Sequence, residues 1–183
     1  MMKLDCKEKA EGTIELKETA PAVMTDMVEY MYTGKIKPLQ ETNPDNFHRF
    51  IEGVNRHLDL AKAAHLYQMP GMKKYCEDNI VQLIQESCYP SSASIPENGI
   101  PDGRAAEFLR EHFRLCDASK ALEMLEVQKA SEQKLISRIR SPSTALNLAI
   151  LAVNHECPRV RAACLNYIGY WPKLLEAFDL LKN

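Results

Sequence analysis

The chain has 183 residues and a formal net charge of −2, with 45% hydrophobic and 26% charged side chains. Acidic and basic residues are interleaved along it, so the basic stripe expected of a nucleic-acid-binding protein is absent. No apolar run approaches the roughly 18 residues that span a bilayer, and the first residues do not resemble a signal peptide. These observations predict a protein of the cytoplasm, the nucleus or both, with neither nucleic acid nor a membrane as a partner.

Residue types that serve catalysis and metal binding are scattered. The six cysteines form no Cys-x-x-Cys pair, which predicts free thiols in a reducing compartment and no zinc site. No glycine-rich phosphate loop or Gly-x-Ser-x-Gly motif is present. We therefore predict no enzyme activity, catalytic residue, cofactor, metal or small-molecule ligand. One alternative stays open: a thiol enzyme with Cys76 as nucleophile beside His57 or His65, although the apolar stripe around Cys76 favours a buried thiol.

The first predicted elements are one short strand and one amphipathic helix. Residues 13–17 alternate between apolar and polar side chains, as a strand does, and so short a strand must pair elsewhere. The next segment predicts a helix that begins at Pro21 and ends at a left-handed cap on Gly34. Its broad apolar face is expected to lie in the core and comprises Val23, Met24, Met27, Val28, Met31 and Tyr32.

The middle of the chain predicts a helical hairpin followed by a loop. A short helical turn is expected around residues 47–54. Apolar residues then recur at helical spacing over residues 58–67 and 72–84, and Pro70 separates the two helices. Residues 87–103 hold three prolines, two glycines and four serines, which predicts a linker or mobile loop.

The last part of the chain is predicted to be helical. A helix is expected over residues 104–115, and Asp117 is expected to cap a second helix that runs from 118 to 139. Residues 128–132 are polar, which predicts an exposed or kinked middle for that helix. The remaining expected helices cover about 143–155, about 158–168 and a short segment that Trp171-Pro172 opens.

An internal repeat relates the two best-defined hairpins. Shifting the sequence by 88 residues places residues 58–80 on residues 146–168 without a gap. The matching proline and cysteine favour a true repeat over the chance likeness of two amphipathic hairpins. The identical pairs are Leu58 and Leu146, Leu60 and Leu148, Ala61 and Ala149, Ala64 and Ala152, Pro70 and Pro158, Cys76 and Cys164, and Ile80 and Ile168.

Several motifs in order resemble the BTB/POZ family of adaptor domains. They are Pro21-Ala-Val23, Tyr32-Thr-Gly34 and Cys76-Glu-Asp78, and they are most similar to those of the speckle-type POZ (MATH-BTB) proteins. The resemblance implies a mainly α-helical fold with three parts. These are a partial BTB/POZ domain with one short strand over residues 1–86, the linker over 87–103, and a three-box or BACK-like helical-hairpin extension over 104–183.

The resemblance also implies a function and a contact site. It implies a protein–protein interaction adaptor that joins a cullin scaffold to a substrate protein in a ubiquitin ligase. The family's cullin-binding signature falls on Cys6-Lys-Glu8, where Cys6 replaces a larger aliphatic side chain and Glu8 supplies the acidic residue. The alternative is that Glu8 is one more solvated charge. The hairpin at 143–168 is expected to provide a second contact surface.

Two departures from the family pattern leave other functions open. The resemblance starts after the strand hairpin and two helices that build most of a BTB dimer interface, so a truncated, non-functional fragment is one alternative. Another is a self-associating, perhaps transcriptional, scaffold that binds no cullin, which the small Cys6 favours. The stretch between the two hairpins is longer than in the relatives, so residues 104–139 are either an insertion or the start of a BACK-like bundle.

Overall fold

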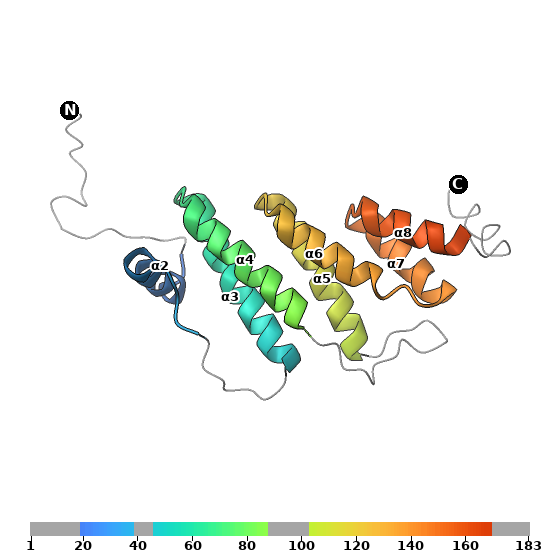
Figure 1. Cartoon of the computed structure of the whole chain (residues 1–183), viewed down its shortest axis with the longest axis horizontal. Helices are drawn as coiled ribbons and strands as arrows, with labels where there is room; N and C mark the ends of the chain where they lie inside the picture. The colour runs from blue at the N-terminus through green and yellow to red at the C-terminus, as the bar shows by residue number, and fades with distance from the viewer. Residues whose placement is uncertain (1–18, 39–45, 88–102, 170–183) are drawn as a thin grey trace, which may run out of the picture. The chain divides into compact units, whose positions relative to one another are not determined.

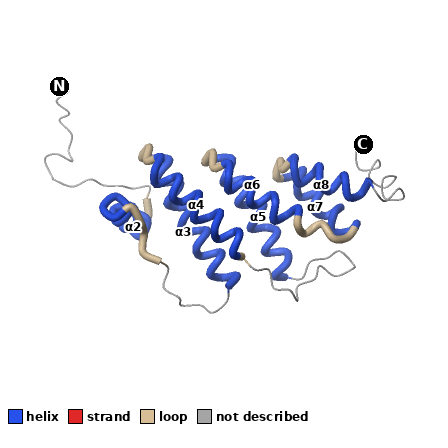
Figure 2. Tube along the Cα trace, in the orientation of Figure 1, coloured by secondary structure: helices blue, strands red, loops and turns tan. Residues whose placement is uncertain are grey.

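The computed structural model describes residues 19–38, 46–87 and 103–169 (Figure 1). Across these three ranges the chain forms seven α-helices and no strand (Figure 2), which confirms the predicted mainly helical fold. The strand predicted at residues 13–17 and the short helix predicted after Trp171 lie outside the described residues. The chain divides into two compact units, residues 1–38 and residues 39–183.

The helix of the first unit, α2 (Pro21–Thr33), has the predicted ends. Pro21 stands in the first turn, and Gly34 adopts φ 70° and donates its backbone N–H to the carbonyl of Tyr30 at 2.7 Å. The broad apolar face is only partly buried: Met27 is 4% exposed, but Met31 is 66% and Tyr32 87% exposed. The prediction that Met31 lies in the core is therefore wrong, because the apolar face is wider than the strip that the chain buries.

The second unit consists of three helical hairpins. The first hairpin is α3 (Asn46–Leu66) with α4 (Pro70–Glu86), the second is α5 (Gly103–Ala121) with α6 (Leu125–Ile136), and the third is α7 (Pro142–Asn154) with α8 (Pro158–Gly169). Helix α6 packs against both α4 and α8, so the second hairpin lies between the other two (Figure 1). The two hairpins related by the 88-residue shift are thus both present, and a third one joins them.

The three hairpins turn in the same way. Gln68, Glu123 and Glu156 have φ values of 55°, 54° and 50° at the corresponding place in each turn. In every turn the next residue donates its N–H to the carbonyl five residues earlier, which closes the end of the first helix. These bonds run from Met69 to Ala64 at 2.7 Å, from Met124 to Ser119 at 2.8 Å and from Cys157 to Ala152 at 2.8 Å. The repeat therefore has three copies, 55 and then 33 residues apart.

The second hairpin corrects two expectations. Asp117 does not cap a helix over residues 118–139: it lies inside α5, and the chain reverses between Leu122 and Met124. No proline or glycine marks this turn, so the sequence does not reveal it. The polar middle of the expected helix is also not exposed, because Ser131 and Glu132 are buried where α6 is covered on both sides.

The second and third hairpins share one apolar core. Aromatic rings of α5 and aliphatic side chains of α6, α7 and α8 contribute to it, together with three cysteines. All four cysteines in the described ranges are buried and free, as predicted for them. The core residues are Phe108, Leu109, Phe113, Cys116, Leu135, Ala145, Leu148, Ala149, Ala152, Cys157, Val160, Cys164 and Ile168.

Candidate interaction surfaces

The residues that the resemblance assigns to cullin binding, Cys6 and Glu8, lie outside the described residues, so their placement stays a prediction. The alternative nucleophile, Cys76, is fully buried on α4. Burial raises the pKa of Cys76 to about 12, so this thiol is protonated at neutral pH and is not activated for attack. The structure therefore disfavours the thiol-enzyme alternative.

The described ranges offer little to a metal ion or a bilayer. They bring together no group of three or more histidine, cysteine, aspartate or glutamate side chains that could hold a metal. Within the same ranges, every helix is too short or too polar to cross a membrane. What the structure does present is a series of helix–helix junctions, one groove and an exposed apolar patch.

The junction between the first and second hairpins is polar at its surface. Glu77 on α4 accepts a hydrogen bond from the backbone N–H of Glu126, in the first turn of α6, at 2.9 Å. Arg114 on α5 donates to the side-chain oxygen of Asn55 on α3 at 2.6 Å. Lys134 on α6 donates to two carbonyls at the end of α4. These bonds come from both helices of each hairpin, so they fix how the two hairpins are aligned.

The junction between the second and third hairpins is fixed by other polar contacts. Lys120 at the end of α5 donates to the carbonyls of His155 and Glu156 in the turn after α7. The ring of His155 bonds to the carboxylate of Asp117 at 2.7 Å and stacks on Phe113, with ring centroids 4.9 Å apart. A cation close to the last carbonyls of a helix is electrostatically favourable, because the helix dipole is negative there.

One repeat position carries a buried or half-buried glutamate in both junctions. Glu132 on α6 stands 55 residues after Glu77, and it pairs with Arg159 at 3.2 Å. Glu126 and Arg159 in turn occupy the same position, the second residue of α6 and of α8. Each glutamate thus contacts the start of the second helix in the next hairpin. The third hairpin has Leu165 at this position, so it carries no such carboxylate.

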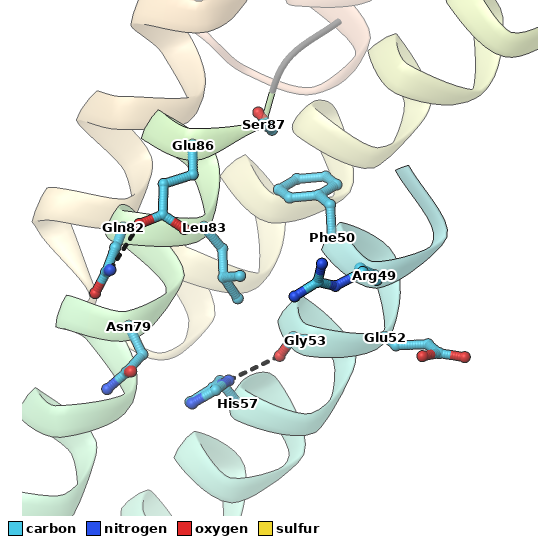
Figure 3. Close-up of a pocket in the computed structure, with 10 residues that line it drawn as sticks. All are labelled: Arg49, Phe50, Glu52, Gly53, His57, Asn79, Gln82, Leu83, Glu86 and Ser87. Carbon is cyan, nitrogen blue, oxygen red and sulfur yellow. Dashed lines mark hydrogen bonds between the residues drawn. The ribbon is translucent and has the colours of Figure 1, made fainter. Parts of the chain in front are cut away.

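A groove of about 360 Å³ lies between α3 and α4 (Figure 3). Gly53 lets the two helices approach closely there, because a Cβ at this position would come within 2.9 Å of the Leu83 side chain. The lining is mixed, with Arg49 and Glu52 on α3 and Glu86, which accepts a bond from its neighbour Gln82, on α4. A lining of this kind suits the docking of a polypeptide segment better than the sequestering of a reacting group.

The repeat explains where this groove lies. Its lining includes His57 and Asn79, whose counterparts in the second hairpin, 55 residues later, are His112 and Lys134. Both counterparts face the first hairpin: the ring of His112 lies 5.7 Å from that of Phe50, and Lys134 donates to the end of α4. The groove therefore occupies the positions with which the second hairpin packs against the one before it.

A second surface is the apolar patch on α2, which comprises Val28, Met31 and Tyr32. These residues are one turn apart, so they form a continuous strip on one side of the helix. The sequence predicted the strip but not its exposure. Neither the groove nor the glutamate contacts were predicted, because both depend on which hairpin lies beside which.

Comparison with known proteins identifies one domain. The BTB/POZ domain family model matches residues 1–84, which include α2, α3 and most of α4. No curated protein and no solved structure matches the chain significantly. The BTB/POZ domain is a non-catalytic protein–protein interaction domain, so protein binding is the activity that this match supports for the amino-terminal part.

Proposed function

We propose that this chain is a non-enzymatic adaptor of the BTB type that joins a cullin scaffold to a substrate protein within a ubiquitin ligase, in the cytoplasm or the nucleus. The observation that carries the proposal is the hairpin α3–α4, which lies within the matched region and is continued by two hairpins of the same design. A rigid stack of helices presents large surfaces to other proteins, as helical repeats generally do. The nearer likeness to speckle-type POZ proteins stays a prediction from the motifs.

Three surfaces have roles in this proposal. Cys6 and Glu8 contact the cullin, as the resemblance implies, and the third hairpin, residues 143–168, extends that contact. The groove between α3 and α4 is the place where a helical segment of another protein packs. In support, the corresponding positions of the second hairpin already pack against a helical hairpin.

A pull-down with purified cullin tests the proposal. The intact chain should capture the cullin, and Glu8→Ala should weaken capture at least about tenfold, because it removes the charged acceptor of the contact. Glu11→Ala is the matched control, since it removes an acidic side chain three residues further along the same segment. Equal capture by both variants, or no capture by the intact chain, would reject the cullin-binding role.

A self-associating scaffold without cullin binding is the second candidate. The observation that favours it is the exposed apolar patch on α2, since exposed apolar side chains at helical spacing commonly mark protein contacts. Light scattering over a range of concentrations should then show an oligomer that Met31→Ser with Tyr32→Ser dissociates. Leu125→Ser, at an exposed leucine on α6, is the control and should leave the mass unchanged.

A further inference from the structure

Two buried thiols meet at the junction between the second and third hairpins. Cys116 lies on α5, and Cys157 is the last residue of the turn before α8. Both belong to the shared apolar core and are fully buried. Their thiols lie within hydrogen-bonding reach of each other, although the two cysteines are 41 residues apart in the sequence. The sequence analysis found no pair because it searched only for short spacings.

The contacts around the two cysteines hold their backbones together. Lys120, one turn after Cys116, donates to the carbonyls of His155 and Glu156, which immediately precede Cys157. Asp117 binds the ring of His155 at 2.7 Å from the same helix. Two separate polar contacts therefore fix α5 against the turn, and the thiols do not have to find each other by diffusion.

The two thiols differ in character. The hydrogen bond from Cys116 and the positive charge of Lys120 lower the pKa of Cys157, whereas the same hydrogen bond and burial raise the pKa of Cys116. Cys76 and Cys164 lack such a neighbour, and burial raises the pKa of each to about 12. Because the thiolate is the form that reacts with peroxides, Cys157 is the preferred site of oxidation among the four described cysteines.

We propose that Cys116 and Cys157 form a peroxide-sensitive dithiol whose oxidation to a disulfide links the second hairpin covalently to the third. The Cys157 thiolate attacks hydrogen peroxide, the O–O bond breaks, and a sulfenic acid and hydroxide form; the hydroxide takes up the proton that the thiol released. The Cys116 sulfur then attacks the sulfenic sulfur, and water leaves with the proton of Cys116. Two thiols are thus oxidised by two electrons while one peroxide is reduced to two waters.

The bond would lock the junction that the polar contacts only hold. Separation of the third hairpin from α5 would then require reduction, so any partner that binds by opening this junction would be excluded from the oxidised protein. The chemistry does not depend on the identity of the partner, and it stands whether or not the chain binds a cullin.

Peptide mapping of the folded, full-length chain tests the proposal. Cys6→Ser and Cys88→Ser are introduced first, so that the four described cysteines remain. The protein is treated with hydrogen peroxide, its thiols are blocked with N-ethylmaleimide, and its tryptic peptides are analysed by mass spectrometry. We expect a Cys116–Cys157 peptide that forms at least about tenfold faster than any oxidation of Cys76 or Cys164, because burial leaves those two thiols protonated.

Single variants separate the two steps. With Cys116→Ser, the sulfenic acid on Cys157 should persist and be trapped by dimedone, whereas Cys157→Ser should leave Cys116 unoxidised. Circular dichroism recorded on the same samples shows that the protein is folded. Equal oxidation of all four thiols, mixed pairings, or a disulfide that forms only in denaturant would overturn the proposal.

Discussion

Glu77 and Glu126 are joined by a 2.9 Å hydrogen bond from the backbone N–H of Glu126 to the side chain of Glu77. The first turn of a helix has N–H groups without partners inside the helix, and side chains usually satisfy them from the residue just before the helix. Met124 holds that place in α6 and has no side chain that can accept a hydrogen bond. The first hairpin therefore supplies the capping carboxylate that the second hairpin lacks.

Removing this cap should destabilise the fold by an amount typical of helix capping. Glu77→Ala is expected to lower the free energy of unfolding by about 0.5–2 kcal/mol, and Glu77→Gln by less, because the amide oxygen still accepts. Glu77 also pairs with the exposed Lys74, so Lys74→Ala is the control for that surface contact and should cost well under 1 kcal/mol. Urea unfolding monitored by circular dichroism gives these values. Equal losses for Glu77→Ala and Lys74→Ala would contradict the capping role.

The pair Glu132 and Arg159 should show coupling in a double-mutant cycle. Glu132 is 1% exposed but Arg159 is 54% exposed, so solvent screens the pair and we expect a coupling of about 1 kcal/mol. Arg159→Ala alone leaves a buried carboxylate without its cation and should destabilise the protein. Adding Glu132→Gln should restore part of that loss, because a neutral amide is less costly to bury. If the two effects simply add, the contact contributes nothing to the junction.

The buried ring of His112 should make the stability of the protein sensitive to acid. Burial, with Lys134 and Arg138 nearby, lowers the pKa of His112 to about 3, and neither ring nitrogen has a hydrogen-bond partner in the described structure. Between this value and the usual pKa of about 6.5, the unfolded chain binds a proton that the folded chain does not. Stability is therefore lost as the pH falls below about 6.5, by about 2 kcal/mol at pH 5 for this group.

Substitution of the ring isolates that contribution. In His112→Phe, the difference in unfolding free energy between pH 7.5 and pH 5 should shrink by about 2 kcal/mol, because the group that takes up the proton on unfolding is gone. His65→Gln, at an exposed position on α3, serves as the control. If His112→Phe and the unaltered chain lose the same stability over this range, His112 is not the buried neutral group described above.

Glycine at the three turns should stabilise the protein. Gln68, Glu123 and Glu156 adopt a left-handed backbone that costs an ordinary residue about 1 kcal/mol. Glu123→Gly is expected to raise the free energy of unfolding by up to about 1 kcal/mol, and the ion pair that it loses to Lys73 is long and exposed. Glu126→Gly, inside the first turn of α6, should destabilise by a similar amount. Thermal melts that show the same sign for both variants would contradict the assignment of the turn.

The sequence predicted the first and third hairpins well because both carry explicit signals. Pro70 and Pro158 mark the start of the second helix, and the alanines at helical spacing mark the tight packing of each pair. The second hairpin has Leu125 at the corresponding place and polar residues in the middle of α6, so its pattern looks like one long amphipathic helix. The signal that identifies it is positional: the turn of the second hairpin lies 55 residues after that of the first.

The candidate interaction surfaces could be predicted only in part. Motif resemblance points to Cys6 and Glu8, and the helical pattern gives the apolar strip on α2. The capping contact of Glu77 could not be read in the same way, because a glutamate on a helix is usually solvated and only the neighbouring hairpin gives it a partner. The same holds for the meeting of Cys116 with Cys157, which depends on how the second and third hairpins are stacked.

The central claim is that this chain binds a cullin as a BTB-type adaptor, and calorimetric titration with a purified cullin tests it most directly. We predict saturable binding that Cys6→Leu tightens by about five- to thirtyfold, because a larger aliphatic anchor buries one or two more methylene groups worth about 1–2 kcal/mol. Glu8→Ala should weaken the same binding. No binding by either the intact chain or Cys6→Leu, while circular dichroism shows both folded, would contradict the account.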